Sequence, residues 1–296
     1  MHQGPDRSPL LKWGFVGPAL VLLTALNVFP LLFNIYLSFT NTDLSGGVVE
    51  GVGMANYTRL LTESRYVDAI TTTALFVACS VMAELVLGFV LALALRDRMP
   101  GKPLVLTVLL IPMMLCPVVM SLFWNLILNG QYGALNQLLA AVGLPEPAWL
   151  TDDDLKLTSI LMVDIWMWTP FMMLISLAGL NAIPKHIYEA AEIDRASRWR
   201  VFRTITLPLC APLLGLAVLL RATDALKQFD LVMAITGPND MTTQTLSARL
   251  YQVVFRDYKV GLGAAYGVVI LVAVILGATI FVRHIERIKR QQGAQL

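Results

Sequence analysis

The sequence predicts an all-α membrane protein whose chain crosses the bilayer six times. Hydrophobic residues make up 57% of the 296 residues and charged residues only 14%, whereas soluble domains have about 25% charged residues. Apolar stretches recur along the chain, and each reaches the roughly 20 residues that a spanning helix needs. The polar segments between them are at most about 30 residues long, too short for a separate soluble domain. We therefore expect residues 1–296 to form a single transmembrane domain.

The expected spanning helices are the apolar stretches 13–39, 70–95, 104–129, 157–183, 208–235 and 263–283. The first exceeds the roughly 7–15 apolar residues of a signal peptide and lacks an A-x-A-like cleavage site, so we expect it to stay uncleaved. The basic segment 96–102 separates the second helix from the third. Pro184 ends the fourth helix, and Pro208 opens the fifth at a position where proline is tolerated. The sixth ends at Arg283.

Lysines and arginines predict the orientation of the chain. If the N-terminus is cytoplasmic, 14 of the 22 basic residues fall in cytoplasmic segments and 6 in external ones, and the remaining two, Arg221 and Lys227, lie within a helix. Positive charge concentrates on the cytoplasmic side of membrane proteins. Both termini and the segment 184–207 are therefore expected in the cytoplasm, in a multi-pass protein of the plasma or inner membrane.

Several kinds of chemistry find no support in the sequence. The net charge of +2 gives no basic block for nucleic acid. No G-x-x-x-x-G-K-[S/T] sequence is present, because the Gly-Lys pair at 101–102 is followed by Pro103, so the chain cannot cradle ATP phosphates. Neither the three cysteines nor the three histidines have the spacing of metal ligands. We expect no enzyme, no catalytic residue, no metal site and no cofactor in this chain.

The polar segment 184–207 between the fourth and fifth helices carries an ordered pattern. Glu189-Ala190-Ala191 is followed by Asp194 and then by Ile205-x-Leu207-Pro208. Residues 185–197 can form a short helix on which the two alanines let a partner approach the backbone, and Glu189 offers a carboxylate to a partner arginine. The alternative is an amphipathic loop whose arginines contact anionic lipid.

This pattern resembles the cytoplasmic coupling loop of ABC-importer permeases, and the chain from about residue 13 to 285 resembles their carbohydrate branch, the maltose- and trehalose-type permeases. In that family the loop docks on an ATPase subunit. The family usually has glycine directly after the aspartate, whereas this chain has Arg195, so the bend must form without glycine's freedom at positive φ. The resemblance implies a coupling role for Glu189, Ala190, Ala191, Asp194, Arg195, Ile205, Leu207 and Pro208.

Charged residues inside the predicted helices mark a second candidate site. The fifth helix has Arg221, Asp224, Lys227 and Asp230 at intervals of three, and the fourth has Asp164 near the aromatic residues around Pro170. Ionisable groups are costly in hydrocarbon and commonly line a substrate path. Carboxylate, amide and guanidinium groups beside aromatic rings suit a sugar, which has hydroxyl groups and apolar C–H faces. The alternative is that the charges pair with each other, or with Glu84, as structural links.

The resemblance also implies substrate-lining positions. Phe229 and Pro170 align with equivalent residues of the maltose-type permease, and the run Arg221-x-x-Asp224-Ala225-x-x-x-Phe229-Asp230 followed by Thr236-Gly237-Pro238 is similar to permeases for trehalose and polyols. The implied substrate-binding residues are Asp164, Met167, Trp168, Phe171, Arg221, Asp224, Ala225 and Gln228.

The resemblance implies a permease subunit of an ATP-driven sugar importer that works by alternating access. Its expected partners are the lipid membrane, a second homologous permease, an ABC ATPase dimer that binds ATP and Mg, an extracellular or periplasmic sugar-binding protein and the sugar itself. The alternative function is an ion-coupled secondary transporter that uses Glu84, Asp164 and Asp224 as proton relays. An intramembrane enzyme is a weaker alternative, because no catalytic cluster supports it.

Overall fold

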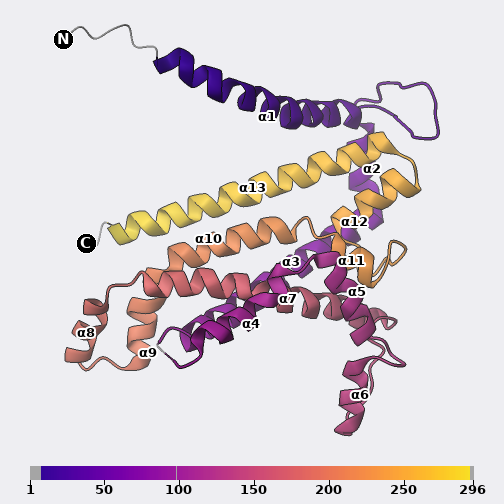
Figure 1. Cartoon of the computed structure of the whole chain (residues 1–296). Coiled ribbons are helices and arrows are strands. Elements are labelled where there is room, and N and C mark those ends of the chain that lie inside the picture. The colour runs from indigo at the N-terminus through magenta and orange to yellow at the C-terminus, as the bar shows by residue number, and fades with distance from the viewer. Residues whose placement is uncertain (1–7, 98, 294–296) are drawn as a thin grey trace, which may run out of the picture. The chain divides into compact units, whose positions relative to one another are not determined.

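The computed structural model describes residues 8–97 and 99–293. Within these residues the chain is all-α, and the only β feature is an isolated bridge between Thr40 and Gly51. Contacts divide the chain into two compact units (Figure 1). The first contains the residues up to Glu63 together with Leu250–Leu271, and the second contains Ser64–Arg249 and the residues from Val272 onward. The predicted all-α fold class is confirmed.

Five helices of the described part are long and apolar enough to cross a membrane: Trp13–Ser38, Ser64–Ala94, Asp153–Asn181, Arg198–Ala225 and Val260–Arg283. A bent helix pair brings the number of spans to six if it counts as one. The shorter helices include α2 (Ala55–Thr62), α6 (Ala134–Ala141) and α12 (Leu246–Tyr251), together with the π turn η2 (Gln252–Arg256). The expectation of six spans joined by short segments therefore agrees with the structure, with corrections to two helices.

The prediction of one continuous helix over 104–129 is wrong. The structure has α4 (Lys102–Met114) and α5 (Pro117–Ile127), which meet at an angle of 97°. Leu115 and Cys116 between them are extended, with ψ of 149° and 127°. Proline disfavours the helical conformation in the residue before it, and Cys116 precedes Pro117. The apolar composition concealed a break that the proline required.

The fifth predicted helix, 208–235, differs from the structure at both ends. It begins earlier, because α9 (Arg198–Val201), the π turn η1 (Phe202–Thr206) and α10 (Leu207–Ala225) are continuous. The π turn lengthens the helix by one residue immediately before Pro208, whose ring would otherwise crowd the carbonyl four residues earlier. The helix stops at Ala225, and α11 (Asp230–Ile235) follows a four-residue break. The Thr245 hydroxyl donates to the Gln228 carbonyl in that break, at 2.7 Å.

The first unit contains α1 (Ser8–Ser38), α2 and the first part of α13 (Val260–Gly293). The Asn34 side chain donates to the Ala264 carbonyl at 3.3 Å, and the Gly261 N–H donates to Thr42 at 2.9 Å. A Cβ at Gly261 would lie 2.0 Å from the Thr40 carbonyl oxygen, so only glycine permits this approach. From Trp13 onward, most apolar side chains of α1 are exposed, as suits a helix surrounded by lipid or another subunit.

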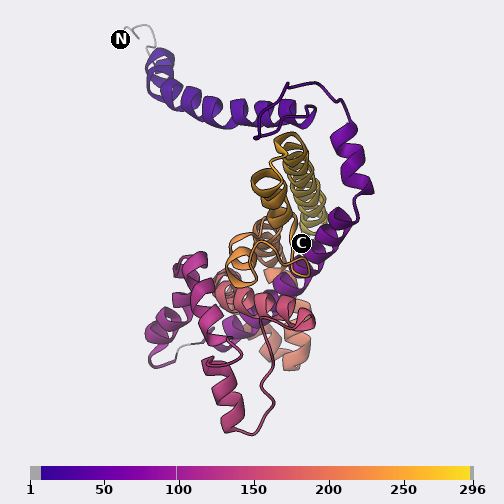
Figure 2. The ribbon, with the colours of Figure 1, turned by 90° about the vertical axis from the view of Figure 1, so that its right-hand side faces the viewer.

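The second unit is built on three long helices that pack together: α3 (Ser64–Ala94), α7 (Asp153–Asn181) and α10. Two buried apolar clusters lie along them. One contains Phe89, Leu180 and Cys210 near the end that carries α8 (Lys185–Ile193), and the other contains Phe76, Val163 and Ile235 near the end that carries α5 and α11. Figure 1 shows α8 and α9 at one end of these helices and α6 extending from the other, and Figure 2, which looks along the helices, shows α6 extending away from the bundle.

Gly88 sets the distance between α3 and α7. A Cβ at this position would lie 2.6 Å from the Met172 Cβ and 2.7 Å from the Met173 backbone nitrogen. Small residues let helices in membranes pack backbone against backbone. Gly88 lies one turn after Glu84 on α3, so this close approach also determines how near Glu84 comes to α7.

We expect Gly88→Ala to destabilise the protein by about 1–3 kcal/mol, the usual cost of forcing atoms into a packed core. Thermal unfolding of the detergent-solubilised protein measures this. Gly179→Ala in α7 is the matched control, because its added Cβ meets nothing closer than 3.6 Å. Equal unfolding temperatures for the two variants would show that Gly88 does not limit the packing.

Candidate functional site: a buried ion cluster, a polar cavity and a cytoplasmic loop

Arg221 of α10 links the three long helices of the second unit. Its Nε donates to Glu84 Oε2 of α3 at 2.9 Å, and its Nη2 donates to Asp164 Oδ2 of α7. Nη1 lies 3.7 Å from Asp224 Oδ2, one turn along α10. The guanidinium carbon lies 5.0 Å from the centroid of the Trp168 ring. One side chain therefore holds α3, α7 and α10 together and contacts an aromatic ring of α7.

Burial gives these ion pairs their importance. The side chains of Glu84 and Asp164 are fully buried and that of Arg221 is 2% exposed. Removing one member of a buried ion cluster leaves an uncompensated charge, which is far more costly than removing a surface pair. Glu84 Oε1 and Asp164 Oδ1 have no hydrogen-bond partner in the described part of the chain. The cluster thus fits the structural-link alternative for Arg221, Asp164 and Glu84, and it positions the residues beside it.

A polar cavity of about 250 Å³ lies next to this cluster. Asp224 is 53% exposed and faces Lys227 at 3.8 Å, so this part of the polar stripe reaches solvent while Arg221 does not. The cavity combines carboxylate, ammonium and amide groups with two aromatic rings, which is the chemistry that sugars require. Its lining residues are Pro117, Met167, Trp168, Asp224, Lys227, Gln228, Phe229, Asp230 and Leu231.

The structure divides the predicted substrate residues into two groups. Four of them, Met167, Trp168, Asp224 and Gln228, line the polar cavity. Asp164, Arg221 and Ala225 are buried behind it, and Phe171 packs edge-on against Trp168 with 6.4 Å between ring centroids.

The cavity also has lining residues outside the eight predicted substrate-binding positions. Lys227 and Asp230 are two of the charged residues that the sequence places at intervals of three. The break between Ala225 and Asp230 places both of them at the wall of the cavity. Pro117 reaches it because α5 turns away from α4 at the 97° bend. Only the pre-proline rule could have signalled that bend from the sequence.

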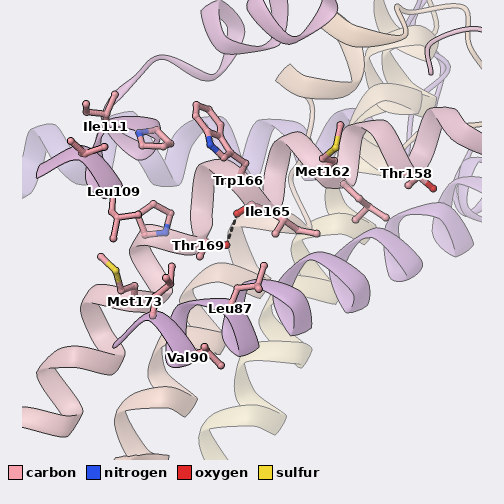
Figure 3. A pocket seen from close by; sticks show the side chains of 15 residues that line it. Leu87, Val90, Leu109, Ile111, Thr158, Met162, Ile165, Trp166, Thr169 and Met173 are labelled. Atoms are coloured by element: carbon pink, nitrogen blue, oxygen red, sulfur yellow. Dashed lines mark hydrogen bonds between the residues drawn. The ribbon is translucent and has the colours of Figure 1, made fainter. Parts of the chain in front are cut away.

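A larger cavity of about 1020 Å³ lies between α3, α4 and α7 (Figure 3). Its labelled side chains include Leu87 and Val90 of α3, Leu109 of α4, and Trp166 of α7. The hydroxyl of Thr169 is already donated to the Ile165 carbonyl at 2.6 Å, drawn as a dashed line. This apolar surface offers a sugar almost no hydrogen bonds, so chemistry favours the smaller cavity as the candidate substrate site.

The segment 184–207 is anchored to the bundle by apolar contacts. Ile187 and Tyr188 of α8 and Phe202 of η1 pack against the buried cluster at the ends of α3, α7 and α10. The Tyr188 hydroxyl lies 3.2 Å from Thr206 Oγ1, and the Arg96 guanidinium lies 4.1 Å above the Tyr188 ring. The segment is therefore attached to the long helices, and sequence reasoning assigned neither Tyr188 nor Arg96 this role.

The bend after α8 forms without glycine. α8 ends at Ile193, earlier than the predicted helix 185–197, and Arg195 adopts φ 53°. The Ala196 N–H donates to the Ala191 carbonyl and the Arg195 N–H to the Glu192 carbonyl, both at 3.0 Å. These two bonds form a Schellman motif, in which the left-handed position usually belongs to glycine. Arg195 thus takes the conformation that its side chain disfavours.

The predicted coupling residues lie on two sides of the loop. Ala190, Ala191, Asp194 and Ile205 line a groove of about 680 Å³ between α8 and η1. Ala191 is only 7% exposed, so its surface faces the chain's own groove. Glu189, Arg195 and Leu207 are exposed outside the groove, and Pro208 lies in the first turn of α10. In the described residues no group of His, Cys, Asp and Glu side chains could hold a metal ion.

Comparisons with known proteins agree with this architecture. A family model described as "Binding-protein-dependent transport system inner membrane component" matches residues 84–291. The trehalose/maltose transport system permease protein of Thermococcus litoralis is 32% identical over 286 residues, covering 96% of each chain. The trehalose transport system permease protein of Mycobacterium tuberculosis is 33% identical, covering 92% of this chain and 88% of its own.

The fold is also similar to solved structures. A crystal structure of a bacterial ABC transporter involved in alginate import contains a chain with a TM-score of 0.82 and 19% identity, covering 94% of this chain and 96% of that one. The alginate transporter in complex with its pentasaccharide-bound periplasmic protein gives a TM-score of 0.80, also at 19% identity, with 92% of each chain covered.

We expect Arg221→Leu to destabilise the protein by about 3–5 kcal/mol, because it leaves Glu84 and Asp164 buried without a counter-charge. Denaturant unfolding in detergent measures the change. The triple variant Glu84→Gln, Asp164→Asn and Arg221→Leu removes all three charges, and we expect it to recover most of the lost stability. If the single variant unfolds like the unaltered chain, Arg221 does not hold the helices together.

Proposed function

We propose, since the chain belongs to the family of binding-protein-dependent transport system inner membrane components, that it is a membrane-spanning permease subunit of an ATP-driven sugar importer. Its substrate is a disaccharide of the trehalose or maltose kind, or a related sugar or polyol. The observation that carries this proposal is the 32% identity to a trehalose/maltose permease over 96% of both chains. The family membership expected from the sequence is confirmed. Membership of this family disfavours the alternative function, an ion-coupled secondary transporter.

The proposed assembly has three protein partners and lies in a lipid membrane. A second, homologous permease completes the pathway, an ABC ATPase dimer binds and hydrolyses ATP with Mg, and an extracellular or periplasmic sugar-binding protein delivers the sugar. The alginate transporter, whose structure includes a periplasmic protein, supports this arrangement by its shared fold. This chain then has no enzymatic activity and no cofactor of its own. The charge distribution supports cytoplasmic termini.

The polar cavity is the proposed sugar contact of this subunit. Trp168 would stack on a C–H face of the sugar, and Asp224 and Gln228 would accept and donate hydrogen bonds to its hydroxyl groups. Its volume of 250 Å³ is below the roughly 300–1,000 Å³ usual for a complete small-molecule pocket. A second permease facing the cavity would supply the remaining wall.

The loop 184–207 is the proposed coupling element. ATP binding closes the two ATPase subunits and displaces the loop. Tyr188 and Phe202, which pack on the bundle, pass the displacement to α3, α7 and α10. Those helices carry the ion cluster beside the cavity, so the movement changes the side of the membrane to which the cavity opens. Hydrolysis returns the subunits to the inward-facing state.

We expect Glu189→Ala to abolish transport by weakening ATPase binding while the helices stay inserted. Co-purification of the ATPase with the permease measures binding. Glu192→Ala is the matched control, because Glu192 has the same charge and is exposed on the same helix. Normal ATPase recovery and uptake with Glu189→Ala would refute the coupling assignment.

We expect Asp224→Ala to raise the KM for sugar uptake by about one to two orders of magnitude, since a hydrogen bond to a charged group contributes about 1.5–3 kcal/mol and each 1.4 kcal/mol is tenfold. The complex should remain intact, because Asp224 lies on the solvent side of the ion cluster. Uptake of labelled trehalose into proteoliposomes containing the whole transporter measures it. Asp68→Ala, an exposed aspartate on α3, is the control, and identical kinetics for both would return Asp224 to a structural role.

A further inference from the structure

Arg195 lies where the coupling loop turns between α8 and α9, and its backbone is strained. Its φ of 53° belongs to the left-handed region, which is unfavourable for a residue with a side chain and free of that strain for glycine. The Schellman hydrogen bonds on both sides hold it there. Glycine would adopt this backbone conformation freely. An arginine that takes it instead is a candidate for a side-chain contact with a partner.

The side chain of Arg195 projects away from the loop's groove. Asp194 and Ala196 on either side of it both line the groove, but Arg195 does not. It is exposed, and it forms no ion pair with any other residue that the structure describes. The guanidinium is therefore presented outward at the turn, with its five N–H donors free for a partner.

The position of Arg195 separates it from the other arginines of the loop. Arg198, Arg200 and Arg203 belong to the helix Arg198–Ala225, which is itself a candidate membrane span. Those three can reach lipid head groups at the end of that span. Arg195 precedes the helix, at the turn that joins it to α8. Its location favours a protein surface over the bilayer.

We propose that Arg195 is a specificity-determining contact to the ATPase subunit, and that it selects an ATPase with a carboxylate opposite the turn. This inference rests on the proposed function, because it requires the loop to dock on an ATPase. The guanidinium forms a bidentate, charge-assisted pair with that carboxylate. A strained arginine here trades loop stability for partner selection, since a permease with glycine would dock without this charge contact.

Arg195→Gly tests the contact without damaging the loop. Glycine relieves the strain, so a loss of binding cannot come from a misfolded turn. The binding of the co-purifying ATPase to the whole permease complex is measured at increasing salt. We expect the Kd to rise about three- to fivefold for Arg195→Gly, with a weaker salt dependence, and to rise further for Arg195→Glu. A single acidic-to-lysine change on the ATPase should restore binding to Arg195→Glu.

Arg203→Glu is the matched control, an exposed arginine of the same loop nearer the bilayer. If it weakens ATPase binding as much as Arg195→Glu does, the effect is general electrostatics and the specific contact is refuted. An unchanged Kd for Arg195→Gly also refutes it. So does a change confined to binding of phosphatidylglycerol vesicles, which would make Arg195 a lipid contact. If the unaltered complex binds no ATPase at all, the proposed function itself fails, and the inference fails with it.

Discussion

The ion pairs of Arg221 are the interaction on which the rest of the second unit depends. Glu84, Asp164 and Arg221 lie far apart in the sequence, yet Arg221 brings them together where water is excluded. A charge in hydrocarbon must be paired, so each helix needs the other two. Gly88 permits the approach of α3 to α7. The polar cavity and the loop 184–207 are both attached to the helices that this cluster holds.

The three long helices carry one candidate site on each side of the ion cluster. Towards α8, Tyr188 and Phe202 pack on the apolar cluster that includes Phe89 and Cys210. Towards α5 and α11, breaks in the helices expose Asp224, Lys227 and Gln228 to a cavity. Buried side chains pack along the helices between the two ends, and these contacts give a displacement at one end a route to the other. This is the physical basis of coupling that the proposed function requires.

Much of the fold followed from the sequence because bilayer thickness and the cost of buried charge act on local composition. Apolar length predicted the spans. It did not reveal the bend between α4 and α5, which lies between Pro112 and Pro117. The end of α10 at Ala225 was less accessible, because it depends on Thr245, 17 residues after the Gln228 carbonyl that it binds. Helix ends that rest on distant hydrogen bonds cannot be derived from local pattern.

The candidate sites were predictable to different degrees. The coupling loop was recognisable as an ordered motif, but the burial of Ala191 and the positive φ of Arg195 depend on how α8 folds back on η1. In the membrane, the charges of α10 were evident, whereas their division into a buried Arg221 and a half-exposed Asp224 depends on which helix faces each one. Helix period places residues on a face but does not say what covers that face.

The central claim is that nucleotide binding by the partner ATPase, passed on through the loop 184–207, changes access to the polar cavity. Gln228→Cys, in a chain whose three native cysteines are replaced, places a thiol at the cavity wall. In proteoliposomes with the whole transporter, we expect a membrane-impermeant reagent to label this thiol from the cytoplasmic side without nucleotide and from the external side with ATP bound. Labelling from the same side in both states would contradict the account.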